Sequence, residues 1–266
     1  AITFPILIFL MAFGMLVGAG ASVRVSILLG RKDIKEAEHT LANAIFLTFF
    51  TQALTIIPCY IFMEPLLRLF GASERTLPYA MEYLQYVVPA NIFSALSFGF
   101  NAIMRASGYP RKAMITMIIG AMTNVVLDYI FIYPLGMGIS GAAIATVISM
   151  IVCSAYVLSH FFRKDSIVRF HRSAFRLSLP VIGGITAIGV APFAMHLTGS
   201  LVNIIMNRSF VSYGETADAT DLAIGAFGII NGYAMLFFMI IIGVAQGMQP
   251  IVGFNYGAKN PGRVKS

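Results

Sequence analysis

Long apolar runs separated by short polar segments dominate this chain. Each run has about twenty residues, the length of helix that crosses a bilayer, and none alternates as a barrel strand does. Because backbone groups in hydrocarbon must be hydrogen-bonded within their own segment, we expect the runs to be helices. The pattern predicts seven membrane-spanning helices, at residues 4–29, 40–63, 83–104, 113–133, 140–162, 177–207 and 222–255.

The composition supports an all-α polytopic membrane protein. Of 266 residues, 58% are hydrophobic and only 11% are charged, whereas soluble domains have about 25% charged residues. The net charge of +7 does not indicate nucleic-acid binding, because the basic residues are spread between the apolar runs. Cys59 and Cys153 lie inside runs without metal-ligand spacing, so we interpret them as small buried hydrophobic residues.

Alternate loops carry most of the 18 Lys and Arg residues, and the loops between them are acidic. By the positive-inside rule the basic loops are cytoplasmic. The longest is the segment 163–176, whose basic residues we interpret mainly as topological determinants; binding to anionic lipid headgroups is the alternative. The basic loops contain Arg31, Lys32, Lys35, Arg105, Arg111, Lys112, Arg163, Lys164, Arg169, Arg172, Arg176, Lys259, Arg263 and Lys265.

An internal repeat becomes visible when the chain is shifted by 227 residues. Six spans fit into that period, so the two copies have the same orientation and are parallel repeats. We therefore expect duplicated six-helix lobes, twelve helices in the full chain, and a fragment lacking one helix before residue 1 and about four after residue 266. The predicted division is 1–162 for the amino-terminal lobe, 163–176 for a basic cytoplasmic linker and 177–266 for the first two helices of the carboxy-terminal lobe. The matched pairs are Val17 and Val244, Gly20 and Gly247, Val25 and Val252, Gly30 and Gly257, Lys32 and Lys259, and Asp33 and Asn260.

Asp128 stands out as a carboxylate inside a long apolar segment. Holding it in hydrocarbon costs roughly 2.5–3.5 kcal/mol on insertion scales, so an intramembrane carboxylate is a candidate functional residue. It could carry a proton, coordinate a sodium ion, or make a structural contact between helices. Asn124 precedes it by four residues and therefore projects from the same helix face.

Several further polar residues lie within the spans. The Thr146 hydroxyl is a candidate third oxygen ligand, with a hydrogen bond to its own helix backbone as the alternative. Asn203 and Asn207 are candidates for lining a cavity, although packing between helices is the favoured explanation. His196 is a lone intramembrane histidine and a candidate cavity-lining proton carrier.

No motif of an enzyme is present in the sequence. It lacks a phosphate-cradling glycine loop followed by Lys, a His pair at helical spacing, and paired carboxylates that would hold a catalytic metal. We therefore expect no catalytic residues, no cofactor and no metal other than a possible Na⁺ at Asp128.

Five segments carry a resemblance to a known family: residues 18–22 running to Gly30, 96–108, 124–128, 138–146 and 247–257. In their order and spacing they resemble the multidrug and toxic compound extrusion (MATE) family of cation-coupled drug antiporters. The resemblance implies two six-helix lobes around a central cavity, with the spans here being the second to the eighth. It also implies a cation site made of Asn124, Asp128 and Thr146 with an Asp on the first helix. Some branches instead place a Glu on the seventh helix, but residues 177–207 contain no Asp or Glu.

The expected function is a cation-coupled (Na⁺ or H⁺) antiporter that exports drugs or toxic organic cations by alternating access. We expect a monomer in a bacterial or archaeal cytoplasmic (inner) membrane, with a small-molecule partner, the bilayer, and no nucleic acid. One alternative is a lipid-linked oligosaccharide flippase or polysaccharide exporter, which would need cationic residues in its cavity. Another is a membrane receptor or scaffold, which would show no substrate flux.

Overall fold

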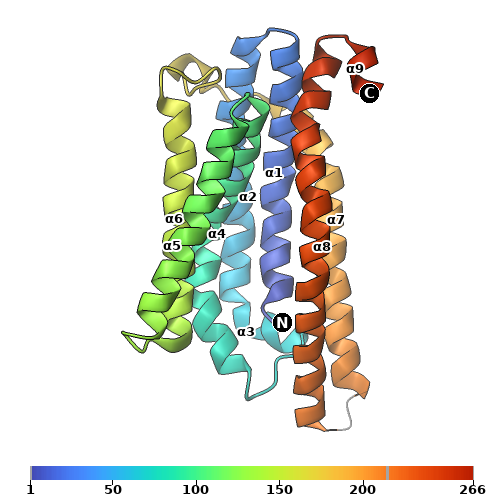
Figure 1. The fold of residues 1–266 in the computed structure, drawn as a ribbon. Helices are drawn as coiled ribbons and strands as arrows, with labels where there is room; N and C mark the ends of the chain where they lie inside the picture. Colours follow the sequence, from blue (N-terminus) through green and yellow to red (C-terminus); the bar gives the residue numbers. More distant parts are fainter. Residues whose placement is uncertain (1, 214–215, 266) are drawn as a thin grey trace.

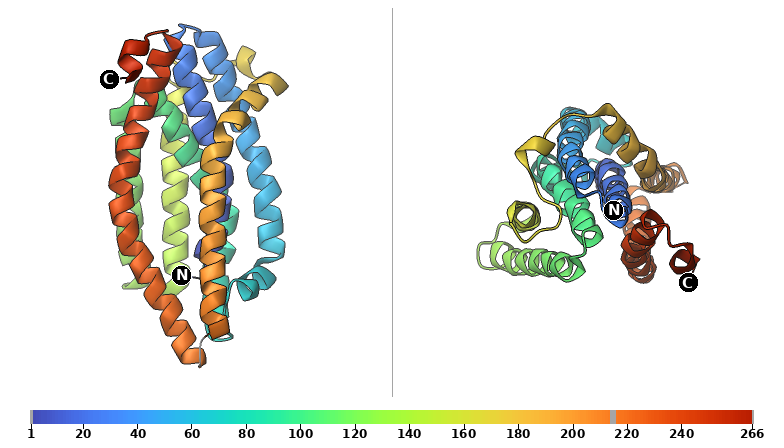
Figure 2. Two further views of the ribbon diagram at one scale, coloured as in Figure 1. Left: turned by 90° about the vertical axis from the view of Figure 1, so that its right-hand side faces the viewer. Right: turned by 90° about the horizontal axis from the view of Figure 1, so that it is seen from above.

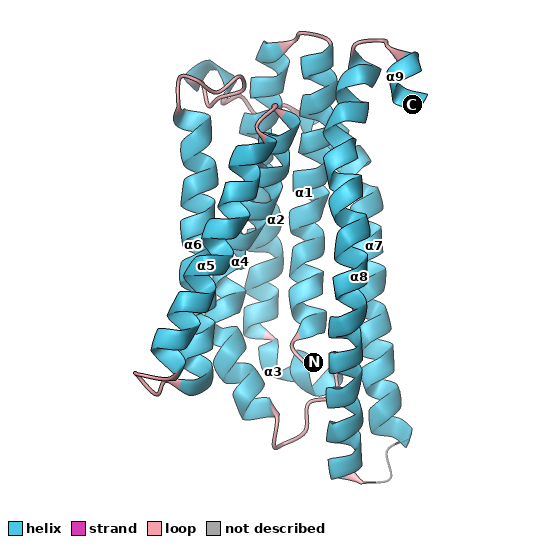
Figure 3. Cartoon of the chain, viewed as in Figure 1, coloured by secondary structure: helices cyan, strands magenta, loops and turns pink. Residues whose placement is uncertain are grey.

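The computed structural model describes residues 2–213 and 216–265, and within these ranges the chain is helical without strands (Figures 1 and 3). Seven of the described helices are long and apolar enough to cross a membrane. All seven predicted spans are thus confirmed as helices. The elements are α1 (Phe4–Gly30), α2 (Ile34–Ile61), α3 (Met63–Leu69), α4 (Leu77–Ala106), α5 (Pro110–Ile132), α6 (Gly138–Phe162), η1 (Arg172–Ala174), α7 (Leu179–Tyr213), α8 (Ala217–Gly257) and α9 (Pro261–Lys265).

Two short helices, α3 and α9, were not predicted. The second apolar run was expected to reach residue 63, but α2 ends at Ile61 and α3 begins at Met63. Arg68 of α3 binds Glu64 at 3.0 Å and Glu74 at 2.6 Å. These ion pairs are exposed, and they lower the pKa of the Glu74 carboxyl. A seven-residue helix with such charges belongs at the membrane surface rather than within a span.

Helix α1 lies at the centre of the described bundle and packs against α2, α4, α7 and α8 (Figures 1 and 2). Small residues let the backbones approach closely, which is how membrane helices associate without a hydrophobic driving force. Gly18 of α1 meets Gly99 of α4, and Gly189 of α7 meets the carbonyl of Leu16. The hairpin of α5 and α6 lies on one side of α1, and α7 and α8 lie on the other.

The loops rich in Lys and Arg meet at one end of the molecule, which we call the basic end (Figure 1). This end contains the α1–α2 turn, the α4–α5 turn, the segment between α6 and α7, and α9. The segregation of charge predicted from the sequence is therefore present in the fold.

The repeat is visible in the backbone at the ends of α1 and α8. Lys32 and Lys259 are equivalent under the 227-residue shift, and within the described residues they are the non-glycine positions with positive φ, 63° and 55°. After each lysine, the next amide donates a 2.9 Å hydrogen bond to the carbonyl five residues earlier. Two sequences that share few identities therefore end their helices in the same way, with a lysine in the left-handed backbone conformation.

Candidate functional site

The residues predicted to form the cation site lie on the α5–α6 hairpin. The two helices are antiparallel and pack closely, since a methyl group at Gly120 of α5 would overlap the sulfur of Cys153 in α6. Nearer the turn, Phe131 lies against Gly141, where an added Cβ would be 3.0 Å from the Phe131 Cβ. Gly136 permits this short connection because its φ is +62°.

These two contacts set the register between the helices. Phe131 lies opposite Gly141, so positions 128 and 124, three and seven residues back along α5, lie at the depth of positions 144 and 148 of α6. Thr146 of α6 therefore lies at a depth between those of Asp128 and Asn124 of α5.

Asp128 has an unsatisfied carboxylate oxygen. The residue is half-buried and lies one turn before the end of α5. Its Oδ1 atom is buried and has no hydrogen-bond partner in the part of the chain that the structure describes. Leaving a buried acceptor unpaired costs about 1–3 kcal/mol, and more for a charged group. A proton or a bound cation would remove this cost, so the arrangement suits a group that binds and releases a positive charge.

Thr146 uses its proton within its own helix. Its Oγ1 donates a 2.9 Å hydrogen bond to the carbonyl of Ala142. This is the alternative that the sequence left open, and it fixes the rotamer of the hydroxyl. The oxygen keeps lone pairs that can accept a hydrogen bond or face a cation.

The polar residues of α7 lie elsewhere. Asn203 donates to the carbonyl of Gly199 at 2.9 Å, a bond within its own helix. Asn207 is only 2% exposed and packs beside Gly71, in the connection between α3 and α4. In this structure a neighbouring loop covers Asn207, and its role in lining a cavity stays a prediction. His196 is half-buried on α7.

A buried polar pair that the sequence analysis did not single out connects α2 and α4. Asn91 donates to Oε1 of Gln52 at 2.9 Å, and both residues are almost fully buried. The Nε2 atom of Gln52 has no partner among the described residues. A cleft of about 10 Å³ beside Asn91, between α1 and α4, has room for about one water molecule. An amide inside an apolar run was the available signal, but the sequence did not indicate its partner.

A larger, mostly apolar cleft of about 370 Å³ lies between α1 and α8, near the basic end. Close to this end Arg105 of α4 reaches across to α8, donating a 3.0 Å hydrogen bond to Gln246 and another to Asn101. Helix α8 therefore contacts helices α1 and α4 mainly near the basic end. The cleft is lined by Val23, Ile27, Ala245, Met248, Gln249, Val252, Gly253 and Tyr256.

Among the described residues, no three His, Cys, Asp or Glu side chains come together in a way that would hold a metal ion. A cation at Asp128 would therefore not be held by a cluster of three such side chains from the described residues.

Comparison with known proteins decides the family. A sequence profile described as MatE matches residues 1–130 and 192–266, which is most of the chain. The chain belongs to the MatE family. It is 27% identical to the multidrug export protein MepA of Staphylococcus saprophyticus over 256 residues, covering 96% of this chain. The alignment covers 55% of that protein, so the chain spans little more than half the length of this relative.

Solved transporter structures show the same arrangement as this MatE chain. One is an outward-facing conformation of a multidrug resistance MATE family transporter, 25% identical, with a TM-score of 0.86, covering 99% of this chain and 58% of that one. Another is an inward-facing conformation of such a transporter, 26% identical, with a TM-score of 0.82, covering 99% of this chain and 59% of that one. The MatE chain is thus an all-α, multi-pass membrane protein with the fold of these transporters.

Proposed function

We propose that the protein containing this chain exports small organic cations or drugs in exchange for Na⁺ or H⁺, and that Asp128 is the coupling carboxylate. The observation that carries the proposal is the buried, unpartnered Oδ1 atom of Asp128. A buried carboxylate oxygen without a hydrogen-bond partner costs free energy, and binding a proton or a cation would remove that cost. Asn124, one turn earlier on α5, and Thr146, at an intermediate depth on α6, would supply neutral oxygen ligands.

The proposed mechanism is alternating access between two lobes, with lobe boundaries as expected from the repeat: 1–162, 163–176 and 177–266. Helix α8 lies against α1 at the basic end, which would close the cytoplasmic side in this conformation. Binding at Asp128 would shift the equilibrium only to the extent that the two conformations differ in affinity for the cation. Export then requires that the cation and the drug prefer opposite conformations.

The test uses the full-length protein in liposomes and measures efflux of ethidium driven by an imposed ion gradient. Asp128→Asn should abolish gradient-driven efflux, because the amide can neither take up a proton nor neutralise a cation. Glu82→Gln is the matched control. It also removes a carboxylate from a helix, but Glu82 is already hydrogen-bonded to Ser140 at 2.6 Å. Efflux that persists unchanged in Asp128→Asn would refute the role of Asp128.

The coupling ion is identified by applying the two gradients separately. An inward Na⁺ gradient at equal pH on both sides would drive efflux only in a sodium-coupled protein. A pH gradient without sodium would drive it only in a proton-coupled one. If neither gradient drives efflux from liposomes containing correctly folded protein, the transport proposal itself fails.

A further inference from the structure

The segment that joins α6 to α7, residues 163–178, is an ordered part of the fold. Val168 and Ala174 are buried at 0% and 7% exposure. The amide of Phe170 donates to the carbonyl of Phe161 at 2.9 Å, and the Ser166 hydroxyl donates to the carbonyl of Val168 at 2.7 Å. The backbone of this segment is therefore held in place by contacts with the rest of the protein and within the segment.

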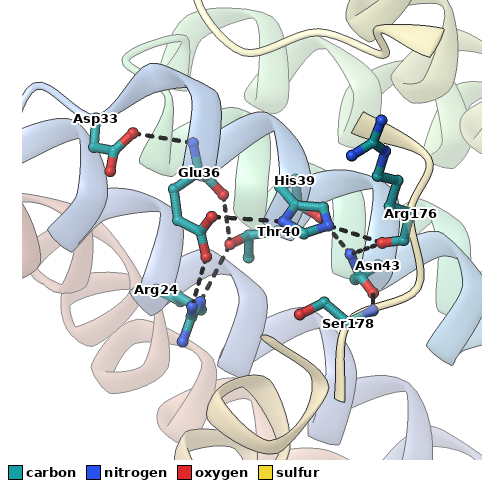
Figure 4. A network of polar contacts seen from close by, with 8 residues as sticks. All are labelled: Arg24, Asp33, Glu36, His39, Thr40, Asn43, Arg176 and Ser178. Atoms are coloured by element: carbon teal, nitrogen blue, oxygen red, sulfur yellow. Dashed lines mark hydrogen bonds and ion pairs between the residues drawn. The ribbon is translucent and has the colours of Figure 1, made fainter. Parts of the chain in front are cut away.

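This segment runs round the outside of α2 (Figure 2). The side chain of Asn43 makes two hydrogen bonds with its backbone. It donates to the carbonyl of Arg176 at 3.0 Å and accepts from the amide of Ser178 at 2.9 Å (Figure 4). Farther along α2, the ring of Phe46 lies 5.9 Å from the ring of Phe175 in the segment. Phe46 is 42% exposed and lies on the outer surface of α2.

The position along α2 sets the depth of the segment. Phe46 comes twelve residues after Ile34, where α2 begins. At 1.5 Å per residue this is about 18 Å along the helix from the α1–α2 turn. The part of the segment around Phe175 therefore lies inward of the α1–α2 turn. Arg169, earlier in the segment, lies beside Glu38, only four residues into α2.

Two kinds of side chain project from this segment. Large apolar ones are exposed beside it, including Phe162 at 69%, Leu177 at 66% and Leu179 at 77%. Basic ones lie between them. Other charges nearby are already paired, because Lys112 binds Asp165 at 3.2 Å and Arg169 lies 3.9 Å from Glu38.

Three exposed basic residues of the segment, Arg163, Lys164 and Arg176, form no ion pair with any described residue. Figure 4 shows the guanidinium of Arg176 turned away from His39 and Asn43, while its backbone carbonyl accepts their hydrogen bonds. Apolar side chains with free cations between them fit the boundary of a bilayer, where the former enter the acyl layer and the latter reach the headgroups.

We propose that residues 162–179 form a binding surface for anionic phospholipid headgroups of the leaflet at the basic end, which the positive-inside rule makes cytoplasmic. This goes beyond the proposed transport function and does not depend on it. A purely topological role for the basic residues would end once the chain is inserted. The proposed headgroup role persists in the folded protein, because Asn43 and Phe46 hold the end of the segment against α2, inward of the α1–α2 turn.

The test uses a tryptophan reporter, Leu177→Trp, in the full-length protein in vesicles; residues 1–266 contain no tryptophan. Quenching by brominated phosphatidylglycerol is compared with quenching by brominated phosphatidylcholine, after subtracting the signal of the protein without the reporter. We expect preferential quenching by phosphatidylglycerol. Each basic residue near an anionic surface strengthens binding by roughly fivefold. Arg163→Gln with Arg176→Gln should therefore lower the binding of phosphatidylglycerol relative to phosphatidylcholine, as obtained from the quenching, by about ten- to thirtyfold.

Two matched variants make the result specific. Arg31→Gln with Lys35→Gln removes the same charge from the α1–α2 turn, at the same end but farther from the bilayer, and should leave the preference intact. Arg163→Lys with Arg176→Lys keeps the charge and should also retain it, which excludes misfolding as the cause. An equal loss in both Gln variants would overturn the proposal, as would no loss in the linker variant. Competition by soluble glycerol phosphate at millimolar concentration would overturn it in favour of a soluble phosphate ligand.

Discussion

Gly30 and Gly257, equivalent residues of the two repeats, each lie against the backbone of the other's helix. A methyl group at Gly30 would overlap the carbonyl oxygen of Phe254, and one at Gly257 would overlap that of Ile27. Residues 27 and 254 are also equivalent under the 227-residue shift. The contact between α1 and α8 is therefore self-complementary, as in a two-fold interface. Ser26 and Gly253, another equivalent pair, touch each other at its centre.

Gly257→Ala should destabilise the folded protein by about 1–3 kcal/mol, the usual cost of overpacking. The added methyl group would meet backbone atoms, which cannot move aside as a flexible side chain can. Gly247→Ala is the control, since a Cβ there has no neighbour within 4 Å. That substitution should be neutral or slightly stabilising. Thermal unfolding of both variants in detergent measures the difference, and equal melting temperatures would contradict the close contact.

A disulfide should form between Ser26→Cys and Gly253→Cys in a protein whose Cys59 and Cys153 are replaced by Ala. The Ser26 Cβ lies 3.1 Å from the position of a Cβ at Gly253, close to the Cβ separation in disulfides of about 3.5–4.5 Å. If the basic end must open during transport, cross-linking should stop ethidium efflux and reduction should restore it. Ser26→Cys with Val244→Cys, placed farther along α8, should not cross-link. Full efflux from cross-linked protein would show that α1 and α8 do not separate.

The pair of Gln52 and Asn91 should behave differently when one or both members are changed. Asn91→Ala leaves Oε1 of Gln52 buried without its donor and should cost about 1–3 kcal/mol of stability. Gln52→Leu with Asn91→Leu removes both polar groups and should cost less than Asn91→Ala alone. Unfolding of the single and double variants in denaturant tests this. A double variant less stable than the single one would indicate that a water or ligand holds the site together.

The ion pair of Lys112 and Asp165 ties the α6–α7 segment to α5. A hydrogen bond from Lys112 lowers the pKa of the Asp165 carboxyl. For a lowered carboxyl pKa, the stabilisation is complete above the unfolded-state pKa and is lost only as pH falls through the folded-state value. Asp165→Asn should reduce the amide exchange protection of residues 163–170, corrected for intrinsic rates. The difference in protection between the parent protein and this variant should stay constant from pH 8 to pH 5, and a difference that disappears within this range would contradict the assignment.

The membrane spans, the charge asymmetry and the repeat were all predictable from the sequence, because a bilayer imposes local requirements. Each span must satisfy its own backbone hydrogen bonds and present apolar side chains for some twenty residues. Charge in each loop is decided by the side of the membrane on which that loop stays. The repeat was seen in a few identities, and Lys32 and Lys259, which it makes equivalent, share the same positive φ in the structure.

Contacts between helices needed the tertiary structure, because they depend on how each helix is rotated against its neighbours. The sequence placed Asn124 and Asp128 on one helix face, but only the packing of α5 on α6 put Thr146 at a depth between them. Only packing left Oδ1 of Asp128 without a partner and covered Asn207 with a loop. The position of residues 163–178 against α2 was likewise invisible in the sequence, since it is held by Asn43, more than a hundred residues away. Local pattern determined which segments cross the membrane, and long-range packing determined which polar atoms remain free to act.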